Sequence, residues 1–142
     1  ISLELTYGLE RIAMFIQGKE NVFDIMWNDR LTYGDLRRRE ELEFSTYNFE
    51  KASVEKHARL FNDFEDEARL CLREGLVLPA YDMVIKCSHT FNMLDARGAL
   101  SVTERTAYIA RVRALAREVA ESYIESRRLQ GFPLLGEGAS RG

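Results

Sequence analysis

Four groups near the start of the chain have types and spacing that could bind a small charged molecule. Residues 3–8 alternate between apolar and polar or small side chains, which predicts a β-strand with Glu4, Thr6 and Gly8 on one face. After Gly8 the pattern becomes helical, and Arg11 falls in the first turn. Free N–H groups and a guanidinium favour phosphate, whereas a carboxylate suits an ammonium group. A purely structural turn with a surface arginine fits the same residues.

Helical periodicity predicts the elements that must position these groups. Gly18 is placed to end a short first helix. Longer amphipathic helices are expected from the Ser53 N-cap to Gly75, from Pro79 to about Gly98, and from the Ser101 capping box to about Gly131. Residues 21–44 give mixed signals and predict a loop with short helical pieces.

The expected fold is mainly α. It is an antiparallel helical bundle preceded by a strand, a turn and a short helix, because three amphipathic helices with short connections must bury their apolar stripes on one another. We expect residues 46–133 to form the bundle and residues 134–142 to be a flexible tail. That residues 1–45 are the end of a separate α+β domain is what the family resemblance described below implies. The absent initiating Met and the abrupt strand indicate a piece of a longer chain.

Composition limits the functional classes. The 142 residues carry 20 basic and 23 acidic side chains, so the net charge of −3 gives no overall signature of a nucleic-acid or membrane binder. No apolar run reaches the roughly 18 residues of a membrane span. Cys71 and Cys87 lie in apolar helical stretches and are expected to be buried thiols, which favours the cytoplasm. His57 and His89 lack partners at metal spacing, so no metal site is predicted.

Two further features have simple structural interpretations. Trp27 is expected to be a core residue or an anchor between subunits. The acidic run of residues 65–67 is most simply a solvated helix face.

Several segments together resemble one enzyme family. "TYGLERI" has the glycine-x-x-arginine and apolar helix of the third signature motif of class II aminoacyl-tRNA synthetases. "ELTYGLERIAMFIQG", "STYNFE", "LPAYD" and "SHTFNMLDARGALSVTER" resemble, in order and at matching spacing, the C-terminal half of the alpha subunit of bacterial-type glycyl-tRNA synthetase. The resemblance covers nearly the whole chain, so it is more specific than the short motif alone.

The resemblance implies a cytoplasmic ligase that activates glycine with ATP and Mg²⁺. A beta subunit, in a heterotetramer of two alpha and two beta chains, then helps transfer glycine to tRNA(Gly). Arg11 matches the arginine that packs on adenine and reaches the γ-phosphate, and Gly8 matches the motif glycine beside the nucleotide. Glu4 and Thr6 replace the small residues of the general class II pattern. They are expected to bind the glycine ammonium group and to exclude larger amino acids.

The resemblance also sets limits. The first two signature motifs are not in this chain, so the chain alone is expected to be inactive and the Mg²⁺ ligands are expected to lie elsewhere. Residues 36–44 are more charged than the family pattern, and no role is carried over to them.

A basic group flanks the last helix and has two interpretations. Its arginines could contact tRNA phosphates or an acidic surface of the beta subunit, or they could form a solvated, partly ion-paired face. The residues concerned are Arg97, Arg105, Arg113, Arg117 and Arg128. A different overall function, a non-catalytic helical module that binds a partner subunit or nucleic acid, remains the alternative.

Overall fold

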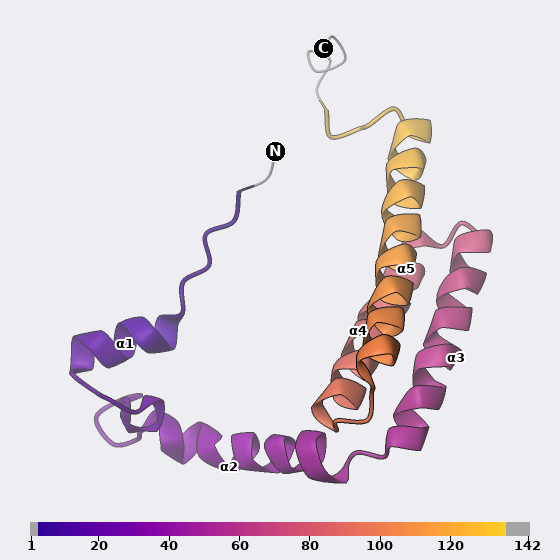
Figure 1. Ribbon diagram of the computed structural model, residues 1–142. Helices are drawn as coiled ribbons and strands as arrows, with labels where there is room; N and C mark the ends of the chain where they lie inside the picture. The colour runs from indigo at the N-terminus through magenta and orange to yellow at the C-terminus, as the bar shows by residue number, and fades with distance from the viewer. Residues whose placement is uncertain (1–2, 136–142) are drawn as a thin grey trace. The chain divides into compact units, whose positions relative to one another are not determined.

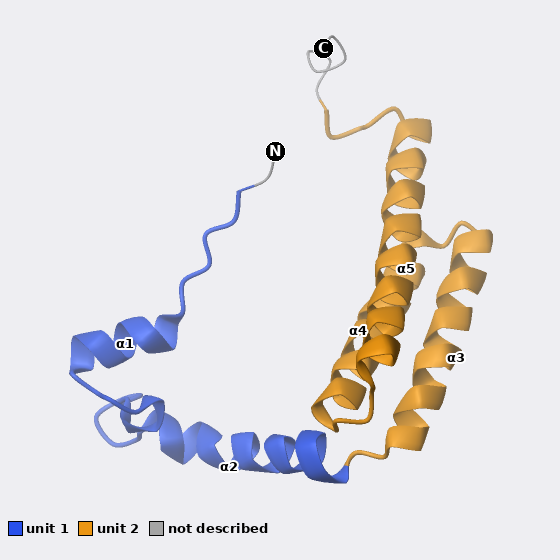
Figure 2. Ribbon diagram, viewed as in Figure 1, with its two compact units in different colours: residues 1–51 blue, residues 52–142 orange. Residues whose placement is uncertain are grey.

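A computed structural model describes residues 3–135, which are mainly helical (Figure 1). The elements are α1 (Leu9–Gln17), η1 (Val22–Asp24), α2 (Tyr33–Thr46), η2 (Tyr47–Lys51), α3 (Val54–Arg73), α4 (Val77–Ala96) and α5 (Val102–Leu129). They divide into two compact units, residues 1–51 and 52–142 (Figure 2). The expected mainly helical fold is confirmed.

The second unit is the predicted antiparallel bundle. Helices α3, α4 and α5 alternate in direction, so α3 and α5 run the same way (Figure 1). Their apolar stripes meet in a core in which Phe61, Cys87 and Leu115 are fully buried. The core cluster consists of Phe61, Ala68, Cys71, Ala80, Val84, Cys87, Leu115 and Val119. Both cysteines are buried free thiols, as the sequence predicted.

The predicted ends of the bundle helices are largely confirmed. The Ser53 hydroxyl accepts the N–H of Lys56 at the start of α3. At the start of α5, Ser101 accepts the N–H of Glu104 at 3.2 Å, and the Glu104 carboxylate accepts the N–H of Ser101 at 2.8 Å. Helix α4 begins two residues before Pro79. Proline is tolerated there because N–H groups of the first turn have no partner within the helix.

The expectation of a loop over residues 21–44 is wrong for its second half, which forms α2. Thr32 and Asp35 make a capping box, with N–H to oxygen distances of 2.8 and 3.1 Å. Along the exposed surface, Arg37 pairs with Glu40 at 2.6 Å. None of the α2 residues is buried. The helix is held by its cap, by ion pairs between neighbouring turns and by contacts of Tyr33 and Arg38 with the ring of Phe23. It lacks the apolar stripe by which helices are recognised.

The predicted strand before Gly8 is not formed. Residues 3–8 belong to no helix or strand, and Leu3 and Leu5 are 86% and 72% exposed. A strand is held by hydrogen bonds to a neighbouring strand. Within residues 3–135 the β-bridge given by the structure joins Met26 to Thr32, so this segment has no pairing partner. The alternation of side chains therefore describes an extended segment, not a paired strand.

Candidate functional site

The Gly8 to Arg11 segment forms the N-terminal turn of α1. Gly8 is the N-cap residue in an extended conformation (φ −74°, ψ 96°), and its carbonyl accepts the N–H of Ile12 at 3.2 Å. The first N–H groups of a helix have no partner within it, so they can bind an anion. Arg11 is exposed in this turn, where its guanidinium is accessible.

Packing within the described residues does not require glycine at position 8. A Cβ atom built there would lie 3.9 Å from Cδ of Arg11, which is ordinary van der Waals contact. The φ angle is also accessible to other residues. The fold of this unit therefore does not require glycine at position 8. Glycine there is consistent with a ligand that needs the space beside the backbone.

Glu4 and Thr6 are brought together by the extended backbone. The Thr6 hydroxyl donates a hydrogen bond to Oε1 of Glu4 at 2.7 Å, and both residues are exposed. This bond orients the carboxylate and leaves Oε2 available as an acceptor. Among residues 3–135 no hydrogen bond or ion pair joins Arg11 to Glu4 or Thr6, so the structure unites the first pair and leaves the guanidinium separate.

A glutamine that the sequence analysis did not single out attaches α1 to the loop before α2. Gln17 accepts the N–H of Met26 at 2.7 Å through its amide oxygen and donates to the Met26 carbonyl at 3.1 Å. Next to this bond, Trp27 is 62% exposed, with its ring centroid 6.5 Å from that of Tyr33. Trp27 is therefore not a core residue of this unit.

The five basic residues flanking the last helix differ in their surroundings. Nε of Arg97 donates to the Ala52 carbonyl at 3.0 Å, which ties the residue after α4 to the segment before α3. Arg105 pairs with Asp95 at 3.1 Å, and Arg128 pairs with Glu125. Arg113 and Arg117 are exposed, and within the described part of the chain neither makes an ion pair. The solvated, ion-paired interpretation thus fits part of the group, and only Arg113 and Arg117 present unpaired charge.

The sequence analysis expected the acidic run of residues 65–67 to be a solvated helix face, but only part of the run is solvated. Glu65 is only 8% exposed, whereas its two neighbours are exposed. Its carboxylate accepts hydrogen bonds from Nε of Arg111 at 2.8 Å and from Nη2 of Arg69 at 3.2 Å. Arg69 also reaches Glu118, and Arg111 reaches Asn62. We call these residues, Asn62, Glu65, Arg69, Arg111 and Glu118, the Glu65 cluster.

Electrostatics keeps Glu65 ionised. Burial of the carboxyl would raise its pKa, but the hydrogen bonds and charges of Arg111 and Arg69 outweigh burial and hold the pKa of Glu65 below its ordinary value. The cluster was missed because its partners come from two helices. One feature of the sequence could have indicated that Glu65 is buried: its helical spacing places it in line with Phe61 and Ala68 of the apolar stripe.

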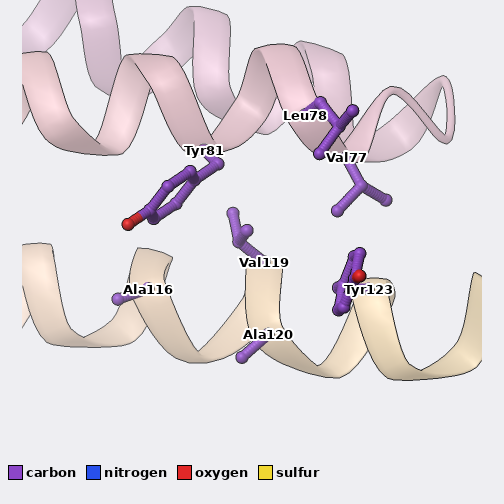
Figure 3. A pocket seen from close by; sticks show the side chains of 7 residues that line it. All are labelled: Val77, Leu78, Tyr81, Ala116, Val119, Ala120 and Tyr123. Carbon is purple, nitrogen blue, oxygen red and sulfur yellow. The ribbon is translucent and has the colours of Figure 1, made fainter. Parts of the chain in front are cut away.

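A shallow apolar groove lies between α4 and α5, with a cavity of about 360 Å³ (Figure 3). Tyr81 from α4 faces Ala116 and Val119 from α5, and Tyr123 lies across from Val77. We call this the α4–α5 groove, lined by Val77, Leu78, Tyr81, Ala116, Val119, Ala120 and Tyr123. Leu78 and Tyr81 are 72% and 53% exposed, so the surface is open in this chain.

The chain as a whole can be compared with known protein families. Within residues 3–135, no helix combines the length and apolar character that a membrane span needs. The family model described as glycyl-tRNA synthetase alpha subunit matches residues 1–128, which include the Gly8–Arg11 turn and nearly all of the bundle. The chain belongs to the glycyl-tRNA synthetase alpha subunit family.

Proposed function

We propose that this chain is part of a glycine–tRNA ligase that makes glycyl-adenylate from glycine and ATP in the cytoplasm. A carboxylate oxygen of glycine attacks the α-phosphorus of ATP, and pyrophosphate leaves. In the second step a hydroxyl of the terminal ribose of tRNA(Gly) attacks the glycyl carbonyl, and AMP leaves. The observation that carries the proposal is the family match over residues 1–128 together with the accessible Arg11 in a helix N-terminal turn.

Arg11 is proposed to bind ATP. Its guanidinium carries a permanent charge and a planar set of donors, which suits phosphate oxygens, and its flat face can stack on adenine. The free N–H groups at the start of α1 add positive potential beside it. Gly8 would let the nucleotide approach the backbone, since nothing in the unit's own packing demands glycine there. Proton transfer by these residues is not required, because positioning and charge neutralisation lower the barrier.

Glu4 and Thr6 are proposed to recognise glycine. The Glu4 carboxylate would pair with the ammonium group, and its hydrogen bond from Thr6 would hold the oxygens in place. Thr6 would also occupy the space that a larger amino acid needs for its side chain. Steric exclusion is effective here because glycine is the smallest substrate that such a pocket could admit.

Partners are proposed on the same basis. The beta subunit and tRNA would bind the assembled enzyme, and the unpaired Arg113 and Arg117 are the best placed basic residues in the last helix to meet phosphate or an acidic surface. Arg97 and Arg105 are less suited to direct contact because internal hydrogen bonds already use their Nε atoms. Mg²⁺ would accompany ATP. The described residues contain no group of three or more candidate metal ligands, and we assign it no ligand here.

The proposal is tested by glycine-dependent exchange between ATP and pyrophosphate. The 142-residue chain alone should show no exchange above background, because the proposed site takes only one wall from it. The complete alpha subunit carrying this sequence, assembled with its beta subunit, should catalyse exchange and should charge tRNA(Gly). An assembled enzyme that binds tRNA but neither exchanges pyrophosphate nor forms glycyl-tRNA would contradict the proposal and would favour the non-catalytic interaction module.

A further inference from the structure

The Glu65 cluster joins α3 to α5 through side chains of opposite charge at the edge of the apolar core. Arg111 of α5 donates to the Glu65 carboxylate through Nε at 2.8 Å and through Nη2, and to Oδ1 of Asn62 at 2.7 Å. One turn further along α3 and two turns further along α5, Arg69 donates to Glu118 at 3.1 Å. Helix α5 is thus bonded to α3 at two points, seven residues apart along α5, in one register.

Aromatic rings hold Arg111 in the orientation that these bonds require. Its guanidinium lies over the ring of Phe61 at 4.5 Å and near the ring of Tyr108 at 5.2 Å. The two rings meet edge to face at 4.6 Å, and Phe61 is fully buried. A guanidinium stacked on rings and bonded to a buried carboxylate has little freedom to follow a displaced helix.

The apolar stripe of α5 fixes its position less strictly. Tyr108, Val112, Leu115, Val119 and Tyr123 recur on one side at steps of three or four residues, with alanines between them. A slide by one turn therefore replaces most of these apolar contacts by other apolar contacts of different volume, although in one direction it brings Arg111 to the place of Leu115. Apolar cores keep folding under such changes but lose a unique arrangement.

The same slide destroys the Glu65 cluster. Moving α5 by four residues brings Ala107 or Leu115 opposite Glu65, and moving it by seven brings Glu104 or Glu118. None of these residues can donate to the carboxylate when ionised, and two of them repel it. Glu65 then keeps only the 3.2 Å hydrogen bond from Arg69 of its own helix and loses both bonds from Arg111. A buried carboxylate that loses most of its partners is unfavourable, so the displaced registers are penalised.

We propose that Glu65 and Arg111 set the register and rotation of α5 in the bundle, a task that the apolar core does not perform alone. The register of α5 also positions two exposed arginines. Arg113 and Arg117 occupy the turns beside Arg111, so the same bonds determine which way these exposed arginines face.

Spin labels on α3 and α5 can measure this register in the 142-residue chain. Cysteines introduced at the exposed positions Lys56 and Glu121 lie toward opposite ends of two helices that run the same way. Their separation is therefore mostly axial, and a slide by one turn changes it by about 5.4 Å. Cys71 and Cys87 are buried, and the chain without introduced cysteines serves as the labelling blank.

The parent chain should give one narrow distance distribution. The double variant Glu65→Leu with Arg111→Met should keep its helical circular dichroism and show a second, shifted population. A folded double variant with one unshifted distance would overturn the proposal. The alternative outcome is that the double variant does not fold and has no helix register to measure. In that event Glu65→Gln, which keeps the shape, provides a second reading: a minor shifted population supports the proposal, and its absence also contradicts it.

The matched control is the exposed pair Asp95 and Arg105, which joins α4 to α5 at 3.1 Å with side chains 37% and 55% exposed. Asp95→Leu with Arg105→Met makes the same chemical change outside the core. It should leave one unshifted distance. A second population in this control as well would show that any lost ion pair loosens α5, and the specific role of Glu65 and Arg111 would be rejected.

Discussion

At the scale of single residues, Glu65 shows how a charged group can be buried in a small bundle. Its carboxylate is removed from water, yet it retains three charge-assisted hydrogen bonds from two arginines. Hydrogen bonds to ionised groups are stronger than those between neutral groups. The ionised form is therefore the one that the folded bundle stabilises.

The acid stability of the bundle should depend on Glu65. Its pKa is lower in the folded chain than the value of about 4.3 expected when unfolded, so the ionised carboxylate stabilises the fold above that pH. This contribution is lost as pH falls through the folded pKa. Urea unfolding of the parent and of Glu65→Gln should differ by about 3–5 kcal/mol at pH 7, the scale for breaking a buried pair, and the difference should shrink below about pH 4.

Glu67→Gln is the control for that comparison, because Glu67 is an exposed neighbour in the same helix. It should change the unfolding free energy at pH 7 by less than about 0.5 kcal/mol. Parallel stability curves for the parent and Glu65→Gln between pH 7 and pH 3 would contradict the assignment of acid sensitivity to Glu65.

Cys87 illustrates the opposite effect of burial. Removal from water, aided by the negative charge of Glu65, raises the pKa of its thiol to about 11, although Arg111 acts in the other direction. Its sulfur lies 3.7 Å from the Phe61 carbonyl, to which the thiol can donate. Cys87 is thus a packed, protonated core residue and not a nucleophile.

At the scale of elements, capping explains the start of the longest helix. Ser101 and Glu104 satisfy each other's N–H groups, and these bonds hold the pKa of the Glu104 carboxyl below its ordinary value, the Ser101 side-chain bond contributing most. The sequence signal was sufficient in this case, because a capping box and a long apolar stripe both pointed to the same helix.

Ser101→Ala should lower the free energy of unfolding by about 0.5–2 kcal/mol, because one N–H of the first turn of α5 loses its acceptor. The measurement is the urea unfolding of the helical circular dichroism signal. Ser122→Ala changes the same residue type inside α5 and should have little effect or be slightly stabilising, since alanine favours helix interiors. Equal losses for both variants would exclude a specific capping contribution.

The predictions from sequence that were wrong have related physical causes. Helix α2 was not predicted because periodicity detects burial, and α2 buries none of its residues. The segment before Gly8 alternates like a strand, but alternation describes side chains and cannot supply a pairing partner. Glu65 was assigned to the surface because its two arginine partners are 4 and 46 positions away, and only the folded bundle brings all three together.

The candidate site was anticipated to a similar extent. The spacing of Glu4 and Thr6 correctly placed their side chains together, since an extended backbone brings residues two apart to one face. The local helix explained the accessible position of Arg11. The sequence also predicted that this guanidinium converges with Glu4 and Thr6, but within residues 3–135 no hydrogen bond or ion pair joins it to either residue. Their convergence depends on how the extended segment is held, and periodicity does not reveal that.

At the scale of the whole molecule, the N-terminal unit carries large apolar side chains that remain exposed. The extended N-terminal segment exposes Leu3 and Leu5, and α1 exposes Phe15 and Ile16, at 88% and 75%. Several exposed apolar side chains in one unit are typical of a surface that packs against further protein. Together with the family match, this supports the proposal that the N-terminal unit acts as one wall of a larger catalytic domain.

The most direct test of the central claim is the exchange activity of an Arg11→Ala variant in the assembled alpha–beta enzyme that carries this sequence. Exchange between ATP and pyrophosphate in the presence of glycine should fall at least about a hundredfold, the scale of losing one group that stabilises developing charge. Arg30→Ala, at an exposed loop position of the same unit, is the matched control and should retain parental activity. Near-parental exchange by Arg11→Ala in a correctly assembled enzyme would contradict the account.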